Sequence, residues 1–155
     1  MPEPTEWYRN LEISVESLKQ RIGAADARDY HLDRLLKIAR RVDEFAPACQ
    51  ECQDFKPQIE SMVRELSANA PQILKEQKRA FLGHMEAILS HLHKTHGLIS
   101  EGQNLAIWLS IGTALGLALG GVFSNPAIGI PIGVGLGIAI GAALDAQAKK
   151  AGRVL

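Results

Sequence analysis

A chain that carries no charged side chain from residue 102 to residue 144 can place that stretch only in a membrane or in the core of a fold. Within it, residues 104–123 and 126–144 are each about long enough to cross a hydrocarbon layer of ~30 Å as a helix. Neither segment keeps the polar face of a helix on a soluble protein. We therefore expect two transmembrane helices. The alternatives are a hairpin buried in a soluble core and a bacteriocin-like segment. We expect no cleaved signal peptide, because the N-terminus lacks the apolar core of one.

Only Ser124 and Asn125 separate the two expected spans, so the spans must form an antiparallel hairpin. Asn125 is placed to cap the second helix, with Pro126 at its first position. Cations lie near the two ends of the hairpin and are absent from its tip: Lys94, Lys149, Lys150 and Arg153. Because cytoplasmic flanks carry the excess of Lys and Arg, we expect a multi-pass protein of the cell membrane with both termini and a basic tail, residues 145–155, in the cytoplasm.

Glycine recurs every fourth residue through both spans, although it is a poor helix former. Mirroring the residue numbers about the turn gives these pairs: Gly120 with Gly129, Gly116 with Gly133, Gly112 with Gly137, and Trp108 with Gly141. Small residues four apart let two helix backbones approach closely in lipid. We therefore expect the glycines to pack the two spans against each other.

A second row of small residues lies on the face roughly opposite the glycines of each span. Its members are Ala106, Ser110, Ala114 and Ala118 on the first span, and Gly135, Ala139 and Ala143 on the second. A lipid-facing row has no need of small side chains, so close packing against another copy explains it. This row predicts a homo-oligomer. The alternative is that Ala and Gly are simply common in membrane helices.

Residues 112–141, followed by the ending "GAALDAQAKKAGRVL", resemble the small bacterial glycine-zipper membrane proteins. The resemblance covers about the last third of the chain. It implies a two-span hairpin that self-associates in the bacterial inner membrane, and it supplies no catalytic residues. Glycine zippers of this sort also occur in pore-forming and channel proteins, so the resemblance favours a pore without defining one.

Residues 1–103 show apolar side chains at helical spacing in four segments, 7–22, 32–42, 55–66 and 74–92. The breaks between them are "GAADARD", "FAPA" and "SANAP". Connections this short favour antiparallel neighbours. We expect an all-α protein, with a cytoplasmic four-helix bundle or pair of helical hairpins followed by the transmembrane glycine-zipper hairpin.

A CxxC motif at Cys49 and Cys52 opens the third of these helices. A helix N-terminus lowers the pKa of a thiol, so Cys49 is expected to be the thiolate, and a cytoplasmic location keeps both thiols reduced. Folding back at "SANAP" brings this motif near "HLHKTH", which supplies His91, His93 and His96. Cysteine and histidine together are the ligand types of a structural zinc site.

Helical geometry argues against a preformed zinc site. At about 100° per residue, His93 points away from the apolar stripe of its helix, and His91 and His96 lie on opposite flanks of that stripe. Three interpretations stay open: packing with a solvated histidine cluster, a redox thiol pair, and a metal site formed by Cys49, Cys52, His91 and His96. Packing is the default expectation and implies no cofactor, with zinc as the alternative.

The sequence shows no phosphate loop, nucleophile elbow or paired-acid motif, so we expect no enzyme. Zero net charge and few aromatic residues leave no sign of nucleic-acid binding. Two function classes remain for an oligomer in membrane lipid. In one, the oligomer is a gated pore, and its candidate pore residues are Glu101, Asn104, Ser110 and Thr113. In the other, the hairpin is an anchor, and the bundle senses metal or redox state through Cys49 and Cys52 or docks a cytoplasmic protein.

Overall fold

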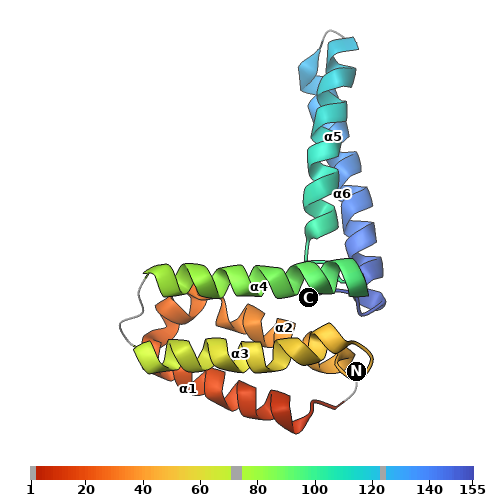
Figure 1. The fold of residues 1–155 in the computed structure, drawn as a ribbon. Helices are drawn as coiled ribbons and strands as arrows, with labels where there is room; N and C mark the ends of the chain where they lie inside the picture. Colours follow the sequence, from red (N-terminus) through yellow and green to blue (C-terminus); the bar gives the residue numbers. More distant parts are fainter. Residues whose placement is uncertain (1–2, 71–74, 123–124) are drawn as a thin grey trace. The chain divides into compact units, whose positions relative to one another are not determined.

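The computed structural model describes residues 3–70, 75–122 and 125–155 (Figure 1). In these ranges the chain is all-helical, with six α-helices and no strand beyond one isolated bridge. The chain divides into two compact units, Met1–His96 and Gly97–Leu155. The predicted turn residue Ser124, the predicted end of the first span at residue 123 and the predicted helix start at residue 74 lie outside the described residues.

The N-terminal unit contains the four helices that the apolar spacing predicts. They are α1 (Glu6–Asp29), α2 (Leu32–Phe45), α3 (Gln50–Asn69) and α4 (Lys75–His96). The predicted break after residue 22 is a kink at Gly23, where φ is 83° and ψ is 165°. Glycine adopts such a conformation without the steric cost that a side chain would bring. The helical path resumes beyond Gly23 and ends at Asp29.

Each of these helices contributes an apolar face to one core. Contacts join α1 to α2 and α3, α2 to α3 and α4, and α3 to α4. The buried side chains include Leu11, Val15 and Leu18 of α1, Leu35, Ile38 and Val42 of α2, Ile59, Met62 and Leu66 of α3, and Phe81, Met85, Ile88 and Leu92 of α4. Full burial of one such side chain contributes about 1.5–3 kcal/mol, so this core supplies most of the drive for folding the unit.

A buried carboxylate ties three segments of the bundle together. Asp43 of α2 is 6% exposed, and it accepts hydrogen bonds from Thr5 N at 3.0 Å and Thr5 Oγ1 at 2.8 Å. Lys56 of α3 donates to it at 2.7 Å. Burial acts to raise the pKa of Asp43, but the hydrogen bonds from Lys56 and Thr5 outweigh it and hold the pKa below its usual value. Asp43 thus fixes the start of α1 against α2 and α3.

The C-terminal unit is a hairpin of two apolar helices, α5 (Gln103–Val122) and α6 (Pro126–Lys150). Both are long and apolar enough to cross a membrane. They expose large apolar side chains, including Leu115 at 58%, Val122 at 78% and Leu136 at 56%. A core helix of a soluble protein would bury such side chains, so exposure on this scale supports the membrane interpretation.

The second helix of the hairpin begins where the sequence predicts and ends later than the predicted span. The side chain of Asn125 accepts a hydrogen bond from Ala127 N at 3.2 Å and so caps α6. The helix continues past residue 144 to Lys150, because the residues that follow include the good helix formers Ala, Gln and Lys. It ends before Gly152, whose φ is 66°.

Candidate functional site

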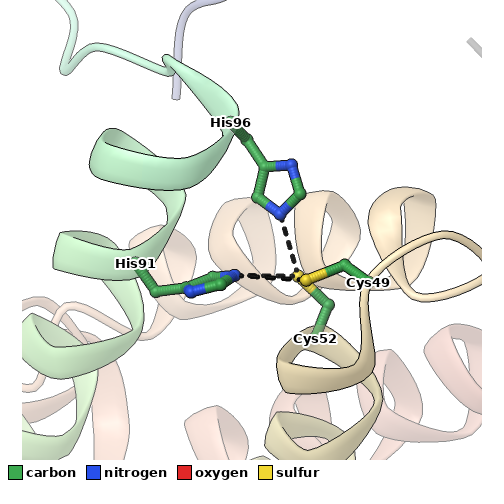
Figure 2. Close-up of side chains that lie close together, drawn as sticks. All are labelled: Cys49, Cys52, His91 and His96. Carbon is green, nitrogen blue, oxygen red and sulfur yellow. Dashed lines mark hydrogen bonds between the residues drawn. The ribbon is translucent and has the colours of Figure 1, made fainter.

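The two cysteines lie on the first turn of α3. Cys49 is the N-cap residue, with an extended backbone at φ −135° and ψ 113°. Cys52 lies three residues later and is fully buried, whereas Cys49 is partly exposed. Although the backbone of Cys49 is not helical, both sulfur atoms point the same way (Figure 2). The start of α3 therefore presents a pair of thiols to whatever packs against it.

Two histidines near the end of α4 turn towards this pair of thiols (Figure 2). His91 Nε2 lies 3.4 Å from Cys49 Sγ and 3.6 Å from Cys52 Sγ. His96 Nε2 lies 3.4 Å from Cys52 Sγ. The four candidate ligand atoms all lie within 4.8 Å of one another. We call these four residues the Cys2His2 cluster.

The expectation that His91 and His96, on opposite flanks of the apolar stripe, make no good inward pair is wrong. Their positions differ by about 140° around an ideal helix at 100° per residue. Their ring centroids are nevertheless 5.2 Å apart. His96 is the last residue of α4, and an imidazole extends far enough from the backbone for both rings to reach the start of α3. His93, the remaining histidine of "HLHKTH", is not a member of the cluster.

Three of the sulfur–nitrogen distances in the cluster match those between ligands of a single tetrahedral metal ion. Zinc–sulfur bonds of about 2.3 Å and zinc–nitrogen bonds of about 2.0–2.1 Å place sulfur and nitrogen ligands about 3.5 Å apart in a tetrahedron. His91 Nε2 lies at 3.4 and 3.6 Å from the two sulfur atoms, and His96 Nε2 lies at 3.4 Å from that of Cys52. Two thiolates and two imidazoles in tetrahedral arrangement are a donor set typical of zinc. A metal ion bound by all four side chains would have no open position for water or substrate, as in structural sites.

Burial favours the neutral form of two members of the cluster. It raises the pKa of Cys52 to about 12, and the hydrogen bond with Cys49 and the charges of Cys49 and Glu51 act in the same direction. Burial, and then the neighbouring His91, lower the pKa of His96. A neutral imidazole is ready to bind a metal, whereas a buried thiol must release its proton as the metal binds. The low pKa expected for a thiol at a helix start does not extend to Cys52.

Three side chains that the sequence did not suggest surround the cluster. Phe45 stacks on His96, with ring centroids 4.0 Å apart and planes 12° from parallel, and Phe55 meets the edge of His91 at 5.4 Å. Glu51 Oε2 lies 2.7 Å from His91 Nδ1. Glu51 stands inside the CxxC motif, and that position was the one sequence signal that could have drawn attention to it.

The structure places the predicted packing glycines between α5 and α6. Seven of them are buried: Gly112, Gly116, Gly120, Gly129, Gly133, Gly137 and Gly141. A Cβ atom added at Gly129 would lie 2.7 Å from Gly120 Cα, and one added at Gly133 would lie 2.6 Å from Gly116 Cα. Real Cβ atoms do not approach other atoms so closely. The two backbones are therefore in contact at a spacing that only glycine allows.

At Gly141 the pairing differs from the mirror prediction. A Cβ atom there would lie 2.6 Å from Leu105 Cα, one helical turn before the predicted partner Trp108. The backbone oxygen of Trp108 instead meets Gly137. The reason is that each residue of a packed helix lies between two residues of its partner, one turn apart. Mirroring the residue numbers about the turn predicts only one of these two neighbours, Trp108, and at Gly141 the other, Leu105, is closer.

The second row of small residues lies away from the glycine contact. All of its members are exposed in the hairpin: Ala106, Ser110, Ala114, Ala118, Gly135, Ala139 and Ala143. Ser110 and Thr113 donate their hydroxyl hydrogens to the backbone oxygens of Ala106 and Leu109, at 2.9 and 2.7 Å. Such bonds within one helix satisfy a hydroxyl in lipid as well as in a pore. Of the other pore candidates, Glu101 is exposed and Asn104 is half-buried.

A carboxylate that the sequence did not single out closes the base of the hairpin. Asp145 of α6 accepts hydrogen bonds from the backbone nitrogens of Asn104 and Leu105, at 3.2 and 3.1 Å, and so caps the first turn of α5. The end of the chain returns to the same base. Ile99 N donates to Arg153 O at 2.8 Å, and Leu155 N donates to Ile99 O at 3.0 Å. Residues 145–155 are thus built into the hairpin unit.

The fold defines a membrane protein with a helical domain followed by a two-helix hairpin. Residues 98–151 match the family model described as glycine zipper membrane protein, which confirms the resemblance for the C-terminal part of the chain. The matched segment contains both apolar helices. No curated protein and no solved structure matches the chain. The match therefore bears on the hairpin unit and leaves the Cys2His2 cluster to be interpreted from its geometry.

Proposed function

We propose that this protein is a membrane-anchored zinc-binding protein, in which the hairpin holds a helical domain that folds around one zinc ion. The observation that carries the proposal is the convergence of four ligand atoms, from Cys49, Cys52, His91 and His96, within 4.8 Å. The cysteines lie at the start of α3 and the histidines at the end of α4, so the two pairs of residues are far apart in the sequence. Their convergence is therefore not a consequence of being neighbours along the chain. A zinc ion bound by all four would have no open coordination position, which supports a structural or sensing role.

Zinc in such a site would act through folding. Ligands that converge only in the folded chain convert binding energy into folding energy, and structural zinc contributes about 10–16 kcal/mol in zinc-finger peptides at neutral pH. The start of α3 and the end of α4 would then be joined in the presence of zinc and held only by packing in its absence. This difference is what a metal-responsive adaptor needs, since a protein partner can distinguish the two states.

A redox thiol pair receives less support from the geometry. A reactive thiol needs an accessible thiolate. Cys52 is fully buried, and its pKa is raised to about 12. Both thiols also face imidazole nitrogens, as metal ligands do. We therefore place zinc binding before redox sensing.

Metal analysis of the full-length protein tests the proposal. We expect about one zinc per chain in protein purified in detergent without chelator, and loss of that zinc in C49S/C52S and in H91A/H96A. The matched control is H84A/H93A, which removes two histidines of α4 outside the cluster and should keep the metal. A wild-type protein that holds no zinc and takes none up, or a C49S/C52S protein that keeps it, would show that the cluster is only packing.

The hairpin favours a second candidate function, self-association in the membrane. Its exposed row of small residues lies away from the glycine contact, and added bulk at Gly135 would meet no atom within 4 Å. Another copy packed against this row would use the same close approach that holds the hairpin together. A pore lined by Ser110 and Thr113 and entered past Glu101 and Asn104 depends on that oligomer. Conductance across planar bilayers, recorded with and without zinc, tests whether the oligomer conducts and whether the cluster gates it.

The charges that flank the hairpin support an orientation in the membrane. Lys149, Lys150 and Arg153 are exposed at the base of the hairpin, and the part of the tip that the structure describes carries no cation. Because excess positive charge marks the cytoplasmic side, we infer that both termini and the proposed zinc-binding domain lie in the cytoplasm of a bacterial cell. Labelling of an engineered cysteine near the C-terminus with an impermeant reagent, in intact and in opened cells, tests this orientation.

A further inference from the structure

We propose that Glu51 is a positioning residue for the metal site: its carboxylate holds the His91 ring so that Nε2 of that ring faces the metal. This inference rests on the proposed function, because it gives Glu51 a role only if the Cys2His2 cluster binds a metal. It concerns a residue outside the four ligands, and it makes a separate prediction about metal affinity.

The contact between Glu51 and His91 is short, and it involves Nδ1, the ring nitrogen that faces away from the thiols. Glu51 Oε2 lies 2.7 Å from His91 Nδ1, whereas His91 Nε2 faces the sulfur atoms of Cys49 and Cys52 at 3.4 and 3.6 Å. The side chain of His91 is 7% exposed and that of Glu51 is 70% exposed. The carboxylate therefore contacts the buried ring from the solvent side, and Nε2 on the other side of the ring faces the two thiols.

Hydrogen-bonding chemistry fixes what this contact does. An ionised carboxylate only accepts hydrogen bonds, and a neutral imidazole carries one N–H and one lone pair. With Glu51 against Nδ1, the hydrogen lies on Nδ1 and the lone pair lies on Nε2. Nε2 is the atom within the cluster, so the tautomer that Glu51 selects is the one that binds a metal there. A carboxylate in this position also makes the imidazole a more basic ligand.

Glu51 lies in the same helical turn as the two cysteine ligands. Glu51 stands between Cys49 and Cys52, so a single turn at the start of α3 supplies two ligands and the group that orients a third. His96 is held by different means, because its ring stacks on Phe45 with centroids 4.0 Å apart. Thr95 Oγ1 lies 3.4 Å from the same Nδ1 of His91. Thr95 could accept the hydrogen if Glu51 were removed, so a test must account for it.

The test measures the zinc affinity of the full-length protein in detergent by competition with a chromogenic chelator. We expect E51A to weaken zinc binding about 10- to 100-fold, the usual effect of losing such a partner of a ligand histidine. E51Q should recover most of the affinity, because its amide oxygen still accepts from Nδ1. E65A removes an exposed carboxylate of the same helix and should leave the affinity unchanged. E51A/T95V is compared with T95V alone, so that Thr95 cannot replace the carboxylate.

The outcomes separate this inference from the proposed function. A wild-type protein without zinc affinity would overturn both. A wild-type protein that binds one zinc, with E51A/T95V matching T95V within about twofold, would leave the site standing and overturn the role of Glu51. The melting temperature of the zinc-free proteins is the readout that a merely structural role would move. Because a carboxylate in the first turn of a helix stabilises that helix, E51A and E51Q are expected to melt slightly and equally below wild type, and a clear further drop in E51A alone would assign Glu51 to folding and overturn the positioning role.

Discussion

His96 Nε2 lies 3.4 Å from Cys52 Sγ, although 44 positions separate the two residues in the chain. His96 is the last residue of α4, and Cys52 lies in the first turn of α3. Helix ends fray first, because their terminal backbone groups lack partners within the helix. A metal held between these two residues would therefore fix two segments that are otherwise among the least stable of the bundle.

Zinc should accordingly slow amide hydrogen exchange in the last turn of α4, residues 92–96. At free zinc of about 100 times Kd, binding stabilises the bound state by about 2.7 kcal/mol, which corresponds to roughly hundredfold slower exchange where opening releases the metal. Exchange in residues 24–29, at the end of α1, should change much less, because local fraying of that end does not release the metal. Mass spectrometry of the exchanged protein measures both, and C49S/C52S should show no zinc effect at either segment. Equal slowing in both segments would indicate global stabilisation instead of a local clamp.

The buried carboxylate of Asp43 gives a prediction that does not depend on metal. D43N should lower the free energy of unfolding of the bundle by about 1–3 kcal/mol at pH 7, because it removes the charged partner of Lys56 and Thr5. D33N is the matched control. Asp33 forms an ion pair with Lys19, but the side chain of Asp33 is 76% exposed, so this pair should contribute less than about 1 kcal/mol to stability. Chemical unfolding followed by circular dichroism measures both.

The pH dependence of the same variant follows from the lowered pKa of Asp43. A carboxylate whose pKa is lower in the folded than in the unfolded state stabilises the fold above its unfolded value, near 3.8, and loses that contribution as pH falls through the lower, folded value. The stability gap between wild type and D43N should therefore be constant from pH 7 to pH 5 and shrink below pH 3.8. A gap that stays constant into strong acid would mean that the carboxylate is not the source of the difference.

The sequence is sufficient to predict the hairpin because its contacts are local and periodic. Two helices joined by a short turn must run antiparallel, and glycine at every fourth position marks the faces that meet. The same reasoning failed at Gly141, where the register offers two neighbours, Trp108 and Leu105, and spacing alone cannot choose between them. The helices of the bundle were also predictable, because apolar spacing reports the buried face of each one.

The Cys2His2 cluster was only half predictable, because it depends on how side chains turn at helix ends. The residue types and the antiparallel fold bring Cys49 and Cys52 near the histidines, but an ideal helix places His91 and His96 on opposite flanks. The rings converge through rotations that no spacing rule contains. Asp43 and Asp145 show the same limit, since each caps a helix to which it does not belong, whereas sequence rules for caps consider only the adjoining residues.

The glycine contact gives a sharp comparison between two alanine variants of the hairpin. In an exposed helix position, Gly to Ala is favourable by about 1 kcal/mol, and at Gly121 an added Cβ would meet nothing within 4 Å. At Gly133 the same atom would lie 2.6 Å from Gly116 Cα. G121A should therefore be neutral or stabilising, whereas G133A should destabilise the hairpin by about 1–3 kcal/mol through overpacking. Unfolding in mixed micelles with increasing SDS measures both, and equal behaviour of the two variants would contradict the packing described here.

The exposed row of small residues gives the last prediction, which concerns the oligomer. A114L/A139L should dissociate a homo-oligomer in mild detergent without loss of helix content, because a lipid-facing surface accepts large apolar side chains whereas a close interface does not. The control adds bulk off the row, in L115F/L136F, at positions that are 58% and 56% exposed. Native mass spectrometry counts the subunits of each protein. The same oligomer in A114L/A139L as in wild type would place the interface elsewhere, and a monomeric wild type would remove both the oligomer and the pore that depends on it.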